Sequence, residues 1–180
     1  MKQFNTLSEY KYFDVVEVEG QTGLKMKHLG VGILPYTTDE NGMINEIGLL
    51  KEFNPFREGN FCHTLITGTV ENTDEALLET AKRELKEEGG YVIADSELQR
   101  WIFLGVFFVD KYSDCQVPVF AVDVTGLQAG EVTGDGSKKE ELSKLEFLPS
   151  NQIVVTDEAL ALAAFLRLFN YFYIKTIGNV

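Results

Sequence analysis

A predicted helix in the middle of the chain, closed by two consecutive glycines, constrains the fold more than any other segment. Residues 76–88 contain strong helix formers and neither Gly nor Pro, and Gly89-Gly90 ends the helix. Thr73 or Asp74 is expected to cap its start. The spacing of its apolar residues predicts a buried face made of Ala76, Leu77, Ala81 and Leu85. This helix therefore has to pack against a larger apolar surface.

The opposite face of this helix carries three carboxylates. Glu84, Glu87 and Glu88 stand at positions i, i+3 and i+4, so their side chains project from one side. Arg83 lies beside them, but one guanidinium does not neutralise three negative charges. A hard divalent cation, Mg²⁺ or Mn²⁺, would do so, because such ions prefer carboxylate oxygen. The alternative is a solvated surface face whose glutamates pair with neighbouring lysines.

The residues around this helix resemble the Nudix box, the signature of the Nudix hydrolases. The family motif is Gly, five residues, Glu, seven residues, then Arg-Glu-apolar-any-Glu-Glu-any-Gly-apolar. Residues 83–91 match its second half at every position. Gly68 is followed by six residues before Glu75, one more than the pattern. Either Asp74 or Glu75 therefore takes the position of the first family glutamate.

The resemblance extends over roughly residues 24–148, and the layout of strands looks like the ADP-ribose pyrophosphatase branch. That branch has Glu-Leu-Pro-Ala-Gly where residues 64–68 read Thr-Leu-Ile-Thr-Gly. It has Gln-Tyr-Arg where residues 52–54 read Glu-Phe-Asn. The family fold implied by the resemblance is of the α/β class, an α/β/α sandwich with a mixed β-sheet.

The resemblance also implies roles for the residues of the box. Glu84 and Glu88 are the leading ligands of Mg²⁺, with Mn²⁺ as a substitute, and Glu87 supports them. The carbonyl of Gly68 is a further candidate ligand. Arg83 is expected to pair with Glu87 or with the acidic residue at position 74 or 75, which would fix the helix.

The implied reaction is attack of water on a diphosphate, with ADP-ribose or a related nucleotide sugar as the expected substrate. The general base is either a glutamate of the box or a carboxylate on a later loop, where Glu140 and Glu141 are the candidates. A solvated charge cluster is the alternative for these two residues. The alternative function is a catalytically inactive Nudix domain that binds a nucleotide as a sensor or regulator, because the longer loop could displace a metal ligand.

Position along the chain suggests which residues bind the substrate. Arg57 and Lys111 could contact phosphate, and Phe56 or Tyr112 could stack on a base. His63 lies near the box and is a further candidate, with a structural role as the alternative.

Composition agrees with one domain spanning residues 1–180, since 44% of the residues are apolar. A net charge of −12 argues against binding to a nucleic-acid polymer. No run of apolar residues approaches the roughly 18–20 needed to span a bilayer, and the N-terminus lacks a signal-peptide core, so a cytoplasmic location is expected. Relatives in the ADP-ribose branch imply a homodimer in which the strands of residues 1–45 take part. The apolar helix at 156–169 is either a core helix or part of that interface.

The remaining elements follow from alternation and turn residues. A turn at residues 37–42 contains Asn-Gly, which suits positive φ angles. Residues 126–139 are Gly-rich and are expected to form a mobile loop. The expected strands are 12–19, 24–36, 44–53, 61–67, 97–110, 117–124 and 144–148.

Overall fold

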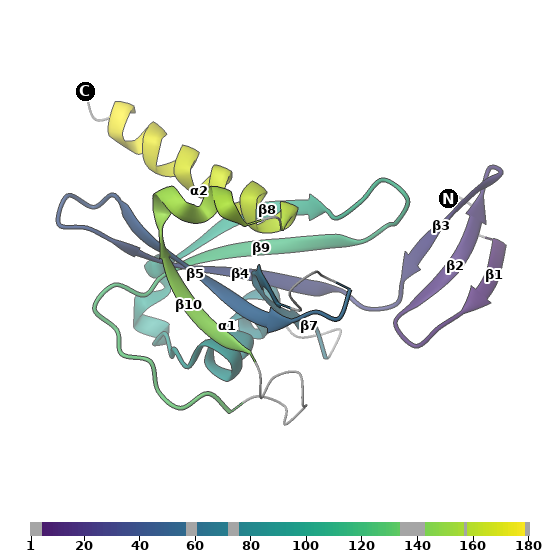
Figure 1. Cartoon of the computed structure of the whole chain (residues 1–180), viewed down its shortest axis with the longest axis horizontal. Coiled ribbons are helices and arrows are strands. Elements are labelled where there is room, and N and C mark those ends of the chain that lie inside the picture. Colours follow the sequence, from purple (N-terminus) through teal and green to yellow (C-terminus); the bar gives the residue numbers. More distant parts are fainter. Residues whose placement is uncertain (1–4, 57–60, 72–75, 134–142, 157, 179–180) are drawn as a thin grey trace.

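A mixed seven-stranded β-sheet forms the centre of the protein in the computed structural model, which describes residues 5–56, 61–71, 76–133, 143–156 and 158–178 (Figure 1). Its main path is β10-β5-β4-β9-β8, with β6 paired to β5 and β7 paired to β4. Strands β4 and β9 run parallel, and the other pairs are antiparallel. The strands are β4 (Gly30–Thr38), β5 (Ile44–Phe53), β6 (Phe61–Thr64), β7 (Ile66–Thr69), β8 (Trp101–Phe108), β9 (Gln116–Asp123) and β10 (Lys144–Pro149).

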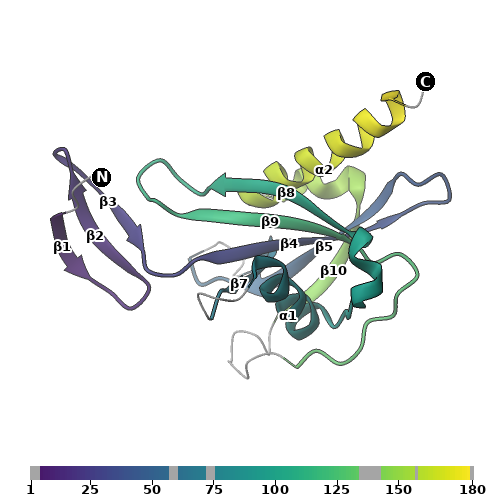
Figure 2. The same cartoon turned by 180° about the vertical axis from the view of Figure 1, so that it is seen from behind.

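One long helix covers each face of this sheet (Figures 1 and 2). Helix α1 (Leu77–Gly89) packs on one face and α2 (Ala159–Gly178) on the other. The buried residues form two clusters accordingly. One cluster includes Ala81 and Leu85 of α1, and the other includes Leu168 of α2. The expected α/β/α sandwich with a mixed sheet is confirmed.

A separate three-stranded antiparallel sheet precedes the sandwich and stands to its side in both views (Figures 1 and 2). Its strands are β1 (Asn5–Glu9), β2 (Phe13–Val18) and β3 (Gln21–Met26). Of the described residues before Gly30, only Val16 is buried. This N-terminal sheet therefore lacks an apolar core of its own.

The loop between β8 and β9 fastens the N-terminal sheet to the sandwich. The Leu24 amide donates to the Tyr112 carbonyl at 2.8 Å, and the Asp114 amide donates to the Leu24 carbonyl at 3.1 Å. The Met26 amide donates to Asp114 Oδ1 at 2.7 Å. A Cβ atom on Gly23 would lie 2.4 Å from the Tyr112 carbonyl oxygen, so the loop approaches β3 too closely for any larger residue.

Several predicted elements are confirmed, and others are wrong at their ends. The strands expected at 44–53, 117–124 and 144–148 match β5, β9 and β10 closely. The turn before β5 has Gly42 at φ +73°, and Asp39 Oδ1 accepts the amides of Asn41 and Met43. The single strand expected at 24–36 is two strands, β3 and β4, which belong to different sheets.

The chain before β8 and the start of the last helix also differ from expectation. Residues 95–100 form the 3₁₀ helix η1 (Asp95–Arg100), where Arg100 Nε pairs with Glu97 at 2.8 Å, so the strand begins only at Trp101. The last helix begins at Ala159 rather than at residue 156. The Glu158 carboxylate accepts the amides of Leu160 and Ala161 there, which satisfies the first free N–H groups of the helix. A second 3₁₀ helix, η3 (Ser150–Val155), occupies the preceding segment.

Candidate active site

Helix α1 begins at Leu77, and Ala76 is its N-cap without a side-chain hydrogen bond. Thr73 and Asp74, the expected caps, lie outside the described residues, and Ala76 is exposed rather than buried. The end of the helix is as expected. Gly90 adopts the left-handed conformation at φ +74°, and its amide donates to the carbonyls of the last turn.

Glu84 is the buried carboxylate of this helix, with only 8% of its surface exposed. It lies against the backbone of Gly68 in β7. A Cβ atom on Gly68 would lie 2.0 Å from Glu84 Cδ and 2.1 Å from Cγ and Oε1. The absence of a side chain at Gly68 therefore provides the space that the Glu84 carboxylate fills.

Arg83 holds the carboxylates around it together. Its Nη1 lies 2.7 Å from Glu84 Oε1, 3.0 Å from Glu87 Oε2 and 3.7 Å from Glu71 Oε1. Its Nη2 donates to the Thr69 carbonyl at 3.1 Å, which connects the helix to β7. The expected pair with Glu87 is present. Glu71 was not predicted, and its only signal in the sequence is its place between Gly68 and the helix.

Burial raises the pKa of the Glu84 carboxyl, and the nearby Arg83 guanidinium opposes this rise without cancelling it. The ionised form of Glu84 is thus costly in the folded protein unless more positive charge is close. A divalent cation would supply such charge, since it binds the deprotonated carboxylate.

The three carboxylates of α1 offer the oxygen ligands that a hard cation prefers. Gly68 leaves room for one of them, Glu84. They do not yet converge. Over the described ranges, no group of three acidic, His or Cys side chains is placed to hold a metal ion together. Glu84 and Glu87 instead face the Arg83 guanidinium.

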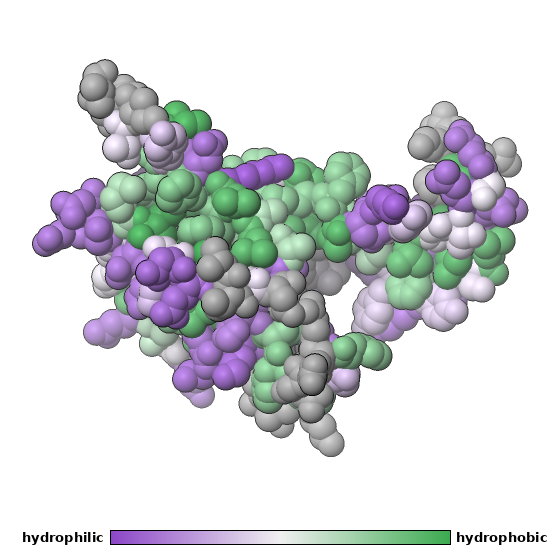
Figure 3. Space-filling view, turned by 45° about the horizontal axis from the view of Figure 1, so that its top comes forward, coloured by the Kyte–Doolittle hydropathy of each residue, from purple (hydrophilic) through white to green (hydrophobic). Residues whose placement is uncertain are grey.

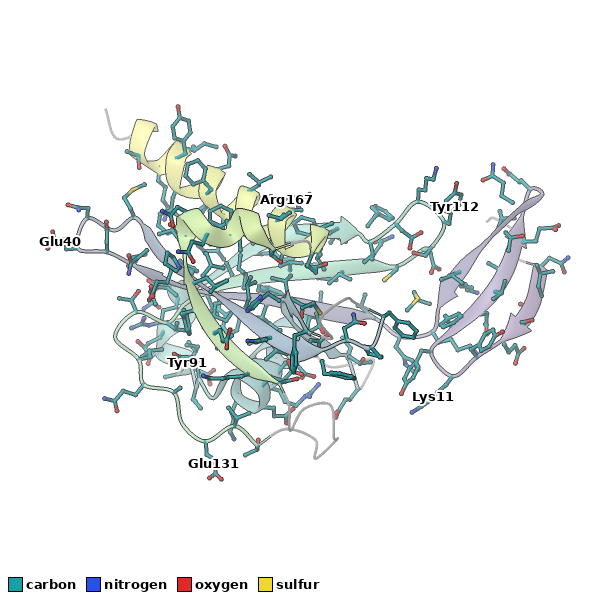
Figure 4. All side chains as sticks on the ribbon, viewed as in Figure 1. Lys11, Glu40, Tyr91, Tyr112, Glu131 and Arg167 are labelled. Atoms are coloured by element: carbon teal, nitrogen blue, oxygen red, sulfur yellow. The ribbon has the colours of Figure 1, made fainter. Side chains whose placement is uncertain are left out.

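The predicted substrate residues lie in different places. Phe56 is 95% exposed in the loop after β5, and its amide donates to Asn54 Oδ1. Lys111 and Tyr112 lie in the β8–β9 loop, where the Lys111 ammonium stands 4.6 Å from the centre of the Tyr112 ring. Figure 4 shows Tyr112 beside the N-terminal sheet and well away from Tyr91, which follows α1. Within one chain, this loop is not brought to the box helix.

His63 has a structural partner. Its Nε2 lies 3.1 Å from Glu146 Oε2, which joins β6 to β10, and its carbonyl accepts the Thr156 hydroxyl at 3.0 Å. The remaining candidates, Arg57, Glu140 and Glu141, lie outside the described residues, as do Asp74 and Glu75. The loop expected at 126–139 is described only up to residue 133.

The described helices include none that is both long enough and apolar enough to cross a bilayer.

Comparisons with known proteins agree with this geometry. A family model described as "NUDIX domain" matches residues 26–169. No curated protein sequence matches the chain significantly. A crystal structure of an ADP compounds hydrolase covers 99% of this chain and 95% of its own, with a TM-score of 0.65 and 18% identity. A protein assigned as a NUDIX hydrolase of Listeria monocytogenes covers 82% of this chain and 95% of its own, with a TM-score of 0.54 and 20% identity. At these identities, the two structures establish a common fold.

Proposed function

Because this chain belongs to the NUDIX family, we propose that it is a hydrolase that cleaves the diphosphate of a nucleoside diphosphate joined to a second group. ADP-ribose or a related nucleotide sugar is the proposed substrate. The similarity of the fold to an ADP compounds hydrolase supports an adenosine-containing substrate. The observation that carries the proposal is the buried Glu84 carboxylate against Gly68, on the same helix as Glu87 and Glu88.

Glu84, Glu87 and Glu88 would hold the divalent cation, Mg²⁺ or Mn²⁺, together with the carbonyl of Gly68. Such a cation, when bound, neutralises phosphate charge and lowers the pKa of a bound water. Burial of Glu84 keeps its carboxylate in one orientation, because packing against β7 leaves it little freedom. The fold thus supplies one oxygen ligand, the Glu84 carboxylate, in a fixed position.

Arg83 acts as a positioning residue in this proposal. Its contacts to Glu84 and Glu87 compensate their repulsion, and its bond to the Thr69 carbonyl fixes the distance between α1 and β7. The guanidinium is already bonded to the protein on both Nη atoms, so it is poorly placed to bind substrate phosphate. The general base remains open between a glutamate of the box and Glu140 or Glu141.

The test is product analysis. The protein is incubated with Mg²⁺ and ADP-ribose, NADH, a diadenosine polyphosphate or (d)NTPs, and products are identified by mass spectrometry beside the Glu88→Gln variant. AMP and ribose phosphate from ADP-ribose, lost in the variant, are the expected result. Cleavage of another compound alone would replace the substrate and keep the reaction. Absence of any turnover by folded protein would refute the hydrolase.

A nucleotide-binding sensor is the second candidate function. The 2.7 Å contact between Arg83 and Glu84 favours it, because a carboxylate paired with an internal cation has less need of a metal. Saturable binding of ADP-ribose without product, unchanged by Mg²⁺, would support this function over hydrolysis.

We also propose a homodimer. Helix α2 buries Ala164 and Leu168 but exposes Leu166 and Phe169 on its outer side. Figure 3 shows hydrophobic residues gathered on the face that carries this helix. The N-terminal sheet has its own uncovered apolar side chains and would cover such a surface in a second copy. Light scattering coupled to size-exclusion chromatography measures the mass. A monomer at micromolar concentration would exclude this assembly.

The cytoplasmic location stays a prediction.

A further inference from the structure

A polar cavity of about 520 Å³ lies at the other end of the central sheet from Gly68. Strand β4 connects the two places. Val31 of β4 faces Gly68, and Tyr36 lines the cavity five residues further on. At about 3.3 Å per residue this is a separation of about 17 Å along the strand. The turn after β4, marked by Glu40 in Figure 4, borders the cavity through Gly42.

The walls of this cavity come from the ends of β4 and β9, from η1, from the start of β8 and from the C-terminal half of α2. The side chains that matter below are Tyr36, Arg100, Asp123, Tyr171, Phe172 and Lys175. They come from positions far apart in the sequence, and none belongs to the Nudix box.

Tyr36 contributes a hydroxyl group to the wall of the cavity. The residue is only 3% exposed, and its ring packs edge-on against Phe172 with 5.7 Å between ring centres. This packing holds the ring in one orientation, so the hydroxyl is a fixed polar group of the cavity wall.

The Tyr36 hydroxyl is a hydrogen-bond donor at any physiological pH. Burial raises the pKa of this phenol far above its usual range, and the nearby Asp123 carboxylate raises it further, against a smaller opposite effect of Arg100. The Tyr36 hydroxyl can therefore donate a hydrogen bond to a ligand oxygen in the cavity.

Arg100 is a fixed cation on the η1 side. Its Nε pairs with Glu97 at 2.8 Å, and its Nη1 donates to the carbonyls of Asp123 and Thr125 at 3.2 and 3.1 Å. These bonds use Nε and Nη1 and hold the guanidinium at the wall of the cavity. Lys175 adds a second cation from α2, where its ammonium stands 4.3 Å from the centre of the Tyr171 ring.

Asp123 supplies a hydrogen-bond acceptor for the hydroxyl groups of a ligand. Its Oδ1 accepts the Thr125 amide at 2.8 Å, which orients the carboxylate at the wall of the cavity. Tyr171 and Phe172 offer aromatic surface beside it. Two cations, one oriented carboxylate and aromatic rings suit a molecule with one anionic group and several hydroxyls.

We propose that this cavity is a second ligand site and that it binds a small sugar phosphate. The phosphate lies between Arg100 and Lys175, and the sugar hydroxyls bond to Asp123 and to the Tyr36 hydroxyl. A volume of about 520 Å³ accommodates a ligand of this size. The site stands apart from the box helix, so it does not depend on the proposed hydrolysis.

Calorimetric titration of the full chain with ribose 5-phosphate, glucose 6-phosphate and inorganic phosphate tests the proposal. EDTA is present throughout, so that no cation at the box helix contributes. We expect saturable binding of at least one sugar phosphate, and weaker binding of inorganic phosphate. Tyr36→Phe removes one hydrogen bond and should weaken sugar phosphate binding about 5-fold to 10-fold. Lys175→Gln should weaken the sugar phosphate and inorganic phosphate alike.

Two matched variants serve as controls. Tyr173→Phe removes an exposed hydroxyl from helix α2. Lys11→Gln removes a lysine that, like Lys175, lies over a tyrosine ring, at 4.6 Å, but before strand β2 of the N-terminal sheet. Both should bind like the wild type. Tyr36→Phe should also leave the melting temperature without ligand unchanged, because the hydroxyl is expected to act on the ligand and not on the fold.

Each contrary result overturns a stated part of the proposal. Failure of every sugar phosphate to bind at millimolar concentration removes the site. Binding unchanged in both Tyr36→Phe and Lys175→Gln places the ligand elsewhere. Equal affinity for inorganic phosphate and the sugar phosphates refutes recognition of the sugar. A drop in melting temperature for Tyr36→Phe without ligand shows that the hydroxyl has a structural partner.

Discussion

Substitution of Gly68 by Ala tests the close contact between β7 and the box helix. The new Cβ would lie 2.0 Å from Glu84 Cδ, whereas carbon atoms in contact normally stand about 3.5–4.0 Å apart. The Glu84 carboxyl group therefore has to move by roughly 1.5–2 Å. Overpacking of this kind costs about 1–3 kcal/mol of unfolding free energy. For a chain of this size, the melting temperature should fall by about 2–4 °C for each kcal/mol.

The effect on activity should be larger than the effect on stability. Displacement of a reacting or binding group by about 1 Å can cost about 100-fold in rate, so kcat/KM should fall by about two orders of magnitude. Steady-state hydrolysis of the best substrate in Mg²⁺, measured beside the melting temperature, separates the two effects. Gly30→Ala is the matched control on the adjacent strand, since its Cβ would only touch the Gly68 carbonyl at an ordinary 3.4 Å.

A double-mutant cycle with Glu84→Ala checks the physical cause. Truncation of Glu84 removes the atoms that the new Cβ would meet, so Gly68→Ala in this background should cost less than about 0.5 kcal/mol. Wild-type stability and activity for Gly68→Ala would refute the reasoning. So would an equal loss of stability in both backgrounds, because the cost would then arise from the strand and not from Glu84.

Three further predictions concern the same helix and the N-terminal sheet. In EDTA, Glu84→Gln should melt at a higher temperature than the wild type above neutral pH. The raised pKa of Glu84 means that the folded protein binds its proton more tightly, so wild-type stability falls as pH rises from the unfolded pKa through the folded pKa. Melting curves from pH 4 to 9 measure this difference, and a constant offset would contradict it. Arg83→Met leaves Glu84 and Glu87 without their shared guanidinium. Mg²⁺ should therefore raise the melting temperature of this variant more than that of the wild type. Equal shifts would argue against a cation at these carboxylates. Gly23→Ala places a Cβ 2.4 Å from the Tyr112 carbonyl oxygen and should separate β3 from the β8–β9 loop. Limited proteolysis should then cut residues 5–26 faster while the rest of the chain stays intact, and an unchanged digestion pattern would show that the loop adjusts.

The parts of the fold that depend on local pattern could be predicted. Short apolar runs predicted β5, β9 and β10, and the run of helix formers before Gly89-Gly90 predicted the end of α1. The break between β3 and β4 was missed, although the alternation of apolar residues changes phase at His28-Leu29, between the two strands. That the two strands join different sheets depends on contacts with distant segments. The parallel pairing of β4 with β9 likewise depends on contacts between distant segments.

The candidate site also has features that the sequence predicts and features that it does not. The spacing of Glu84, Glu87 and Glu88 predicts a shared helix face, and two of the three, Glu84 and Glu87, contact the Arg83 guanidinium. The reason for a glycine at position 68 is steric, and it becomes visible only when the register of β7 and the packing of α1 are known. No sequence pattern predicts the ion pair between Arg83 and Glu71, because it depends on the path of the chain after β7.

The scarcity of buried residues in the N-terminal sheet has a consequence for how the chain folds. Both apolar clusters lie entirely within residues 31–172, whereas the described residues before Gly30 add only Val16 to the buried set. Apolar burial therefore gives this sheet little free energy to offset the entropy of ordering its strands. We expect the sandwich to form first and the β8–β9 loop to act afterwards as a template on which β3 becomes ordered. The family model begins at residue 26, so it matches the sandwich and leaves out almost all of this sheet.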